Sequence, residues 1–305
     1  MRPDVRLILA LWALVGLGLP LVIALQGAMK RDPEMRGPRW SWAKGDLRLT
    51  LVSTALYTLA FNLVFITQEL FLVLPKALTP GLHPVLFHNN HDWTGHNPLA
   101  ELEQGAGALV ILLVGLGAVW TLKRRPPASP TWRLFLTWVA FNGLFQALPQ
   151  VVVGAMLPAN DVGRAMTFLA LGPVTITLAV LLALWAMANA GVWLPRAFLS
   201  LAAEPAETAT RQARSRLMLR AATLPCVLGT ALVIPFRLPG SWDQTILVPV
   251  AVASLGVAWV QASAWRARPL AADLPARPLR LVWPALALVV MLLVFQLVLR
   301  PGIAF

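Results

Sequence analysis

Charged side chains are scarce in this sequence. Only 12% of its 305 residues are Asp, Glu, Lys or Arg, whereas apolar residues make up 58% and the mean hydropathy is +0.70. A globular protein carries charge on about a quarter of its residues, because its surface must stay in water. The shortage excludes a soluble enzyme, a disordered chain and a nucleic-acid-binding module as the main interpretation. It predicts an integral membrane protein.

Cysteine and histidine are also rare, with one and four residues. The single cysteine, Cys226, allows no disulfide within the chain and no cysteine-rich metal site. We expect it to be a packing residue, because it lies inside an apolar run. The sequence has no Walker A motif, no Rossmann glycine pattern and no Gly-x-Ser-x-Gly elbow. Complete catalytic or nucleotide-binding signatures are therefore absent.

Long apolar runs, by contrast, are abundant. A helix that crosses a membrane needs about 20 mostly apolar residues, and eight segments meet or approach that length. They cover residues 7–28, 49–74, 105–122, 133–157, 166–194, 220–237, 245–265 and 281–299. We predict an all-α integral membrane protein, a bundle of about eight transmembrane helices in one domain covering residues 1–305. The first run is longer than an ordinary signal-peptide core, so we interpret it as a retained helix.

Basic residues concentrate in alternate loops. Nineteen of the 25 Lys and Arg residues fall between spans 1 and 2, 3 and 4, 5 and 6, or 7 and 8. Basic loops stay in the cytoplasm, so both termini and the loop 75–104 are predicted to be extracytoplasmic. Segment 196–219 is expected to form a cytoplasmic amphipathic helix. The composition, rich in Ala, Leu, Arg and Pro, is typical of a GC-rich bacterial genome, which makes the bacterial inner membrane the predicted location.

Two spans carry polar stripes on one helical face each. The stripes are Thr54, Thr58, Asn62 and Glu69 with the adjacent Gln68 on the second span, and Asn142, Gln146 and Gln150 on the fourth. Polar groups that face lipid are costly, so the stripes should face protein, most simply each other. They would either fix helix packing or line a polar cavity. Glu69 is the sharpest functional candidate, and Lys76 is one candidate partner for its carboxylate.

All four histidines fall in the loop after the second span: His83, His88, His91 and His96. With a spacing of three residues, His88 and His91 would share a face if this segment were helical, and Asp161 in a later outer turn is a third candidate ligand. Imidazole and carboxylate bind divalent transition metals, which are the cofactors such a site would take. The alternative is a loop of hydrogen-bonded turns, with Asp161 or Asn160 capping the next helix and Arg164 pairing with Asp161.

Two motifs resemble those of the site-2-protease (M50-like) membrane family. That family carries His-Glu-x-x-His on one spanning helix, and a later span begins near an Asp-Gly that supplies the third zinc ligand. Here the stretch Gln68-Glu69-Leu70-Phe71-Leu72 occupies the first pattern, and Glu69 matches the family's general base. Asp161 in Asn160-Asp161-Val162-Gly163-Arg164 is similar to the second. Both histidine ligands of the first motif are missing, so the resemblance implies a non-peptidase relative.

Three functional hypotheses follow from these patterns. The first is a binding or assembly component, with a polar region between spans 2 and 4 under the histidine loop. The second is a transporter or permease subunit. The third is a membrane-embedded metalloenzyme that uses Glu69 as general base and His88, His91 and Asp161 as metal ligands. The lack of a complete catalytic motif favours the first. Its expected partners are membrane lipids and other membrane proteins, not nucleic acid.

Overall fold

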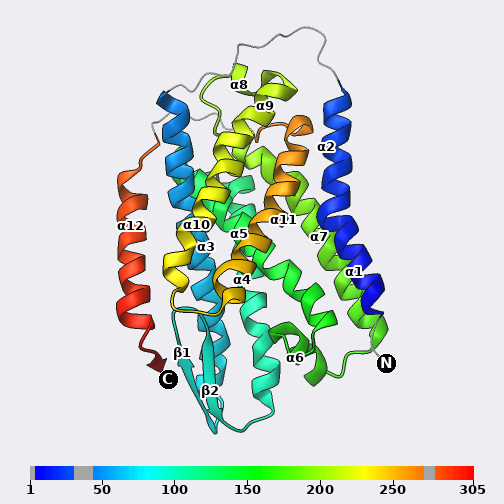
Figure 1. Cartoon of the computed structure of the whole chain (residues 1–305), viewed down its shortest axis with the longest axis vertical. Helices are drawn as coiled ribbons and strands as arrows, with labels where there is room; N and C mark the ends of the chain where they lie inside the picture. Colours follow the sequence, from blue (N-terminus) through cyan, green and yellow to red (C-terminus); the bar gives the residue numbers. More distant parts are fainter. Residues whose placement is uncertain (1–3, 31–43, 271–278) are drawn as a thin grey trace.

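A bundle of long helices makes up most of the molecule (Figure 1). The computed structural model describes residues 4–30, 44–270 and 279–305. Within these residues, eight helical segments are long and apolar enough to cross a membrane. They are Val5–Met29, Asp46–Leu78, Leu99–Arg124, Pro130–Met156, Pro173–Leu199, Arg211–Arg237, Asp243–Arg266 and Val282–Leu299. The protein is a multi-pass membrane protein.

Four of these spans are single helices and four are assembled from shorter pieces. The single ones are α3 (Lys44–Leu78), α4 (Leu99–Arg124), α5 (Pro130–Met156) and α7 (Pro173–Leu199). The composite ones are α1 (Val5–Ala13) with α2 (Leu19–Met29), α9 (Arg211–Met218) with α10 (Leu224–Arg237), α11 (Val248–Ser263) with the turns on either side of it, and α12 (Val282–Leu293) with the turn after it. A π-helical turn lies in each composite span, at Leu14–Gly18, Leu219–Thr223, Asp243–Leu247 and Val294–Leu299. Such turns redirect a helix without ending it.

The second and fourth spans form the centre of the bundle. In α3 and α5, 83% and 72% of the most apolar window is buried, against 22% in the first span and 17% in the last. Lipid tails are as apolar as leucine, so peripheral helices can leave leucine and valine side chains uncovered. The polar stripes predicted on spans 2 and 4 therefore lie on the two most enclosed helices.

Small residues and aromatic rings bring the central helices together. Gly115 of α4 meets Gly143 of α5 so closely that a Cβ on Gly143 would lie 2.7 Å from the Gly115 Cα. Close backbone approach of this kind is a main source of helix association in membranes. Between α3 and α5, the Tyr57 and Trp138 rings pack edge to face at 4.9 Å. The Trp138 indole donates to Ser53 Oγ at 2.9 Å, which satisfies its buried N–H.

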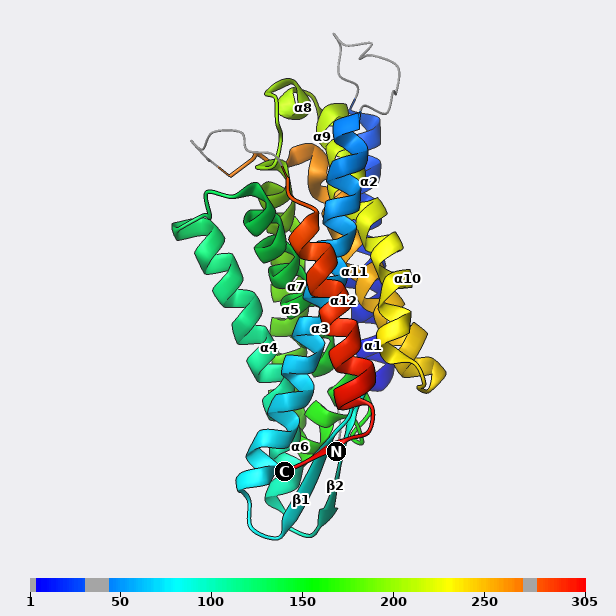
Figure 2. The ribbon, with the colours of Figure 1, turned by 90° about the vertical axis from the view of Figure 1, so that its left-hand side faces the viewer.

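The two ends of the bundle differ in structure. The start of α1 and the C-terminal residues lie at the same end as the strands β1 (Leu82–Leu86) and β2 (His91–Gly95), whereas α8 (Ala206–Ala209) and α9 lie at the other (Figure 2). We call these the outer end and the basic end. The sequence prediction that both termini share one side with the histidine loop is confirmed. Which side faces the cytoplasm stays a prediction from the loop charges.

The eight-span prediction is confirmed, with three local differences. The histidine loop is not free of regular structure, because β1 and β2 form a hairpin and the C-terminal strand β3 (Ile303–Ala304) pairs with the other side of β1. The fifth span begins at Pro173 rather than near residue 166, since the separate helix α6 (Asp161–Phe168) ends in a turn first. Segment 196–219 is not one helix: α7 runs to Leu199, and α8 and α9 follow.

Candidate functional site: an outer polar cluster

A hydrogen-bonded chain of three side chains connects the hairpin to two spans at the outer end. His91 of β2 contacts Glu69 of α3 through Nδ1 and Oε2 at 2.8 Å, and Gln104 of α4 through Nε2 and Oε1 at 3.1 Å. The His91 and Glu69 side chains are only 10% and 7% exposed. Each ring nitrogen thus has one hydrogen-bonding partner, a carboxylate on one side and an amide on the other. The arrangement is a buried acid–base pair held between three elements.

The hairpin positions His91 through its turn geometry. Gly81 precedes β1 and Gly95 ends β2, and their φ values of +83° and +93°, where a side chain would be strained, shape the open end of the hairpin. The Phe87 amide donates to the Asn90 carbonyl at 2.9 Å and closes the turn. The expectation that His88 and His91 share a helical face is therefore wrong. His91 begins a strand, whereas His88 lies in the turn before it.

His88 is buried away from the three-residue chain. It is 4% exposed, and it lies near the connection between α10 and α11, where Arg237 and Pro239 are its neighbours. Burial lowers the pKa of this imidazole below its ordinary 6.5. The prediction that His88 acts together with His91 gains no support from this placement.

Trp93, two residues after His91 on β2, has two cationic side chains near its ring. Lys76 Nζ is 4.9 Å from the centre of the Trp93 ring, and the Arg164 guanidinium is 5.6 Å from it. Lys76 is fully buried and donates to the Leu72 carbonyl at 2.7 Å. Arg164 pairs with Glu101 at 3.2 Å. The candidate pairs Glu69–Lys76 and Asp161–Arg164 are thus replaced by Glu69–His91 and Glu101–Arg164.

Asp161 lies beside this group at the start of α6. The helix is capped by the Asn160 side chain, which accepts from the Val162 amide at 3.3 Å, so Asp161 is left to face the cluster. Burial raises the pKa of the Asp161 carboxyl, and the nearby Glu69 carboxylate raises it further, while His91, Lys76 and Arg164 act in the opposite direction. We refer to Glu69, Lys76, His91, Trp93, Glu101, Gln104, Asp161 and Arg164 as the outer polar cluster.

The polar stripes of α3 and α5 lead from this cluster toward mid-membrane. Gln150 donates to Gln68 Oε1 at 2.7 Å, which confirms that the two stripes meet at this level. One turn deeper, Gln146 Nε2 lies 3.4 Å from both the Phe61 carbonyl and Asn142 Oδ1. Asn62 donates to the Thr58 carbonyl at 2.9 Å, while its buried Oδ1 has no partner among the described residues. The deepest amide oxygen is therefore left unsatisfied.

A cavity of about 500 Å³ lies beside the cluster at the outer end. Glu101 and Arg164 line it together with His96, Thr167 and Phe168. Such a volume falls within the range of about 300–1,000 Å³ typical of small-ligand pockets. Glu101 and Arg164 are therefore the two members of the cluster that a polar group can reach through this cavity.

No three His, Cys, Asp or Glu side chains in the described parts of the chain are grouped so that they could hold a metal ion. The ligand set of His88, His91 and Asp161 stays a prediction, as does Glu69 as a general base. In the structure both His91 nitrogens are already engaged by Glu69 and Gln104.

Sequence reasoning overlooked four contributors to this end of the molecule. Gln104 and Glu101 belong to a polar run that opens α4, and their spacing of three residues could have marked one face. Trp93 lies outside the spans, and its sequence neighbours give no sign of the cations that pack near its ring. Arg237 ends the apolar run of α10; it is 2% exposed, stacks on Phe65 at 3.3 Å and feels the charge of Glu69. A charged residue closing an apolar span was the available signal.

No family model matches the chain, and neither a curated protein nor a solved structure is significantly similar to it.

Proposed function

We propose that this protein is a binding or assembly component of a bacterial inner membrane, and that the outer polar cluster is its recognition site. The supporting observation is the buried Glu69–His91–Gln104 chain with the ligand-sized cavity beside it. In this role the cluster holds a polar group of a ligand or a partner protein. The hairpin covers the three hydrogen-bonded side chains Glu69, His91 and Gln104, which hold the cluster in place.

Energetics favour recognition over a purely structural role. Replacing a buried ion pair with well-packed apolar side chains is often neutral or stabilising, so such pairs are a poor device for stability. Ionisable residues within membrane spans are expensive and are characteristic of functional sites. This chain has only 13 acidic residues, and three of the cluster's eight members are acids: Glu69, Glu101 and Asp161. That concentration in a charge-poor chain points to a ligand.

The chemistry of the cluster indicates which groups it would bind. The lining of the cavity is mostly apolar, and its polar side is the paired Glu101 carboxylate and Arg164 guanidinium, an acceptor and a donor that an incoming polar group would meet together. A group carrying both donors and acceptors, such as an amide or a zwitterion, matches this pair. Arg164 also contacts the ring of Trp93, which lies two residues after His91 on β2. A ligand in the cavity would therefore also affect the hydrogen bonds between Glu69, His91 and Gln104.

Native mass spectrometry of the detergent-purified protein tests this proposal. The wild-type protein should carry a non-covalent ligand or partner that is lost in the double variant Glu101→Ala/Arg164→Ala. The matched control is Glu204→Ala/Arg268→Ala, which also removes one exposed charge of each sign but at the basic end. A wild-type protein without a bound species, or one whose bound species survives the cluster variant, would contradict the proposal.

Metal content separates this proposal from the metal-dependent alternative. That alternative expects near-stoichiometric metal in the purified protein, lost from His88→Ala/His91→Ala and retained in Glu69→Gln, since Glu69 would be base and not ligand. Metal in neither the wild-type protein nor the variants would contradict it. The measurement is elemental mass spectrometry on the same preparations.

A transport role is the second candidate, and the line of amides between α3 and α5 favours it. Gln68, Gln150, Gln146 and Asn62 extend from the cluster into the most enclosed part of the bundle, where the Asn62 Oδ1 is unsatisfied. Substrate paths commonly follow such buried polar groups. Asn62→Leu and Gln146→Leu should then abolish flux of the bound species across proteoliposomes. If the wild-type protein binds the species but does not move it across the membrane, the transport role is contradicted and only the binding role remains.

A further inference from the structure

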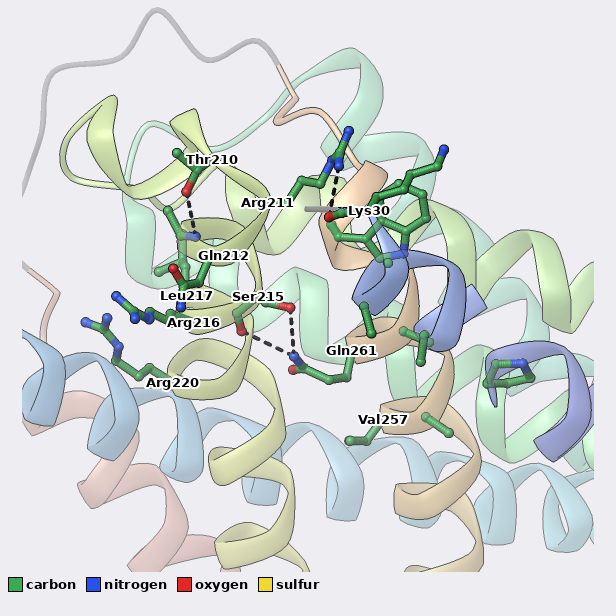
Figure 3. Close-up of a pocket in the computed structure, with 18 of the residues that line it drawn as sticks. Lys30, Thr210, Arg211, Gln212, Ser215, Arg216, Leu217, Arg220, Val257 and Gln261 are labelled. Carbon is green, nitrogen blue, oxygen red and sulfur yellow. Dashed lines mark hydrogen bonds between the residues drawn. The ribbon is translucent and has the colours of Figure 1, made fainter. Parts of the chain in front are cut away.

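A large groove opens at the basic end, far from the outer polar cluster (Figure 3). It has a volume of about 1310 Å³ and lies between α2, α9 and α11. Small-molecule pockets measure about 300–1,000 Å³, so the groove has room for something larger. Its inner walls are apolar and include Leu17, Leu21, Ala24, Val257 and Ala258. Leu17 and Leu21 are still 62% and 60% exposed, so this wall lacks a covering partner among the described residues.

The mouth of the groove is basic. Lys30, Arg211, Arg216 and Arg220 line it, and Glu207 is the acid among its lining residues. Arg211 lies next to Lys30, and Arg216 and Arg220 extend toward the other side of α9 (Figure 3). An apolar wall below a cationic mouth matches a molecule with an anionic head and an apolar tail.

Two cations converge on one indole at the mouth. Lys30 Nζ and the Arg211 guanidinium lie 5.2 Å and 5.7 Å from the centre of the same Trp265 ring. Trp265 is fixed by donating from Nε1 to the Ile23 carbonyl at 3.0 Å, and Arg211 donates to the Lys30 carbonyl at 3.2 Å. Lys30 and Arg211 therefore place two positive charges beside one indole at the edge of the apolar wall, which is a setting suited to an anionic headgroup.

We propose that the groove binds one anionic phospholipid, with its phosphate between Lys30 and Arg211 and an acyl chain along Leu21 and Ala24. The loop charges predict that this end faces the cytoplasm, where the leaflet carries anionic lipids and basic residues near its surface attract them. The first span is otherwise weakly held, with 22% of its apolar window buried. The acyl chain completes the packing between α2 and α11.

Native mass spectrometry with titrated lipid tests this assignment. Phosphatidylglycerol is added to the detergent-purified protein, and phosphatidylcholine serves as the neutral comparison. The wild-type protein should bind one phosphatidylglycerol in preference to phosphatidylcholine. Lys30→Gln/Arg211→Gln should weaken that affinity about 30-fold, because each basic group near a membrane surface contributes roughly a factor of five. Arg124→Gln/Arg125→Gln, which removes two exposed charges at the end of α4, is the matched control and should bind normally.

Two further variants separate charge from shape. Arg211→Lys keeps the positive charge and should bind within about threefold of the wild-type protein, since lysine is also an effective phosphate binder. Ala24→Trp fills the groove and should abolish selective binding, while Leu25→Trp, on an exposed position outside the groove, should not.

Three outcomes would overturn the lipid assignment: equal binding of the two lipids, equal losses in the charge variant and its control, or a wild-type dimer that Ala24→Trp dissociates. The last would identify a second copy of the chain as the occupant of the groove. Size-exclusion profiles and melting temperatures of every variant show whether each remains folded, so that lost binding is attributed to the groove and not to misfolding.

Discussion

Helix α3 carries an acidic side chain with a basic partner near its start and another in its outer half, in different surroundings. At the basic end Asp46 pairs with Arg220, and at the outer end Glu69 pairs with His91. The first pair is next to an open groove, with its side chains 13% and 18% exposed; the second is under the hairpin, at 7% and 10%. The Asp46–Arg220 pair therefore borders the open groove at the basic end, whereas the Glu69–His91 pair is surrounded by protein. This difference in surroundings should decide what each pair is worth.

The largest effect is expected from breaking the outer pair. Glu69→Ala leaves His91 buried against Gln104 without its carboxylate, and removing one partner of a buried pair costs about 3–5 kcal/mol. The double variant Glu69→Leu/His91→Leu should recover part of that loss, because no uncompensated charge is left. Denaturant titration in mixed micelles measures the free energy of unfolding. A double variant as unstable as the sum of its single variants would show that the two residues act independently.

The basic-end pair should matter less. Asp46→Ala should cost about 1.5–3 kcal/mol, the range for a hydrogen bond to a charged group, because water and lipid phosphates can solvate the Arg220 that is left behind. The same titration gives the value. If Asp46→Ala is as costly as Glu69→Ala, the contrast between the two ends fails.

Asp161 should make the stability of the outer end depend on pH, because its carboxyl lies near that of Glu69. Burial and the Glu69 carboxylate raise its pKa above 3.8. The protonated carboxyl therefore contributes its full share to the folding stability below pH 3.8, and this contribution is lost as the pH rises through the raised pKa. Asp161→Asn should therefore raise the melting temperature at pH 7 and flatten its decline between pH 4 and 7. Glu204→Gln, at an exposed position of the basic end, should change neither value.

His88 should give the opposite pH dependence. Burial lowers its pKa below 6.5, so stability is full above pH 6.5 and declines as pH falls through the lowered pKa. His88→Gln should flatten the melting temperature between pH 7 and 5, whereas His83→Gln, at an exposed site of the same hairpin, should leave the decline unchanged. An unchanged decline in both variants would place the acid sensitivity elsewhere.

The smallest effect is expected at the rim of the outer cavity. The Glu101–Arg164 side chains are 45% and 35% exposed, and exposed ion pairs contribute about 0–1 kcal/mol. Glu101→Gln should change the free energy of unfolding by less than about 1 kcal/mol, and the change should shrink in high salt. A larger, salt-independent loss would mean that this pair belongs to the buried part of the cluster.

The spans could be predicted because their signal is local. About 20 apolar residues in a row specify a crossing helix whatever surrounds them, and the amide spacing on α3 and α5 correctly anticipated the Gln68–Gln150 contact. Even the sixth span, interrupted by Pro225 and Pro235, forms as expected. Helix geometry alone was enough for these elements.

The partners of Glu69 could not be predicted, because they depend on a non-local arrangement. His91 is 22 residues away in sequence and reaches Glu69 only because the hairpin folds back over α3. A five-residue strand such as His91–Gly95 carries little apolar alternation, so its pattern does not separate it from a loop. The position of Asp161 could be predicted in part, because the loop charges place its turn on the same side of the membrane as the histidines.

The third strand of the outer sheet sets an order of assembly. β1 is the central strand and pairs on one side with β3, where the Phe305 amide donates to the Pro84 carbonyl at 3.0 Å. Because β3 follows the eighth span in the chain, the sheet that carries His91 gains its last strand only after every helix has been synthesised. This pairing ties the segment that follows the eighth span to the hairpin that carries His91.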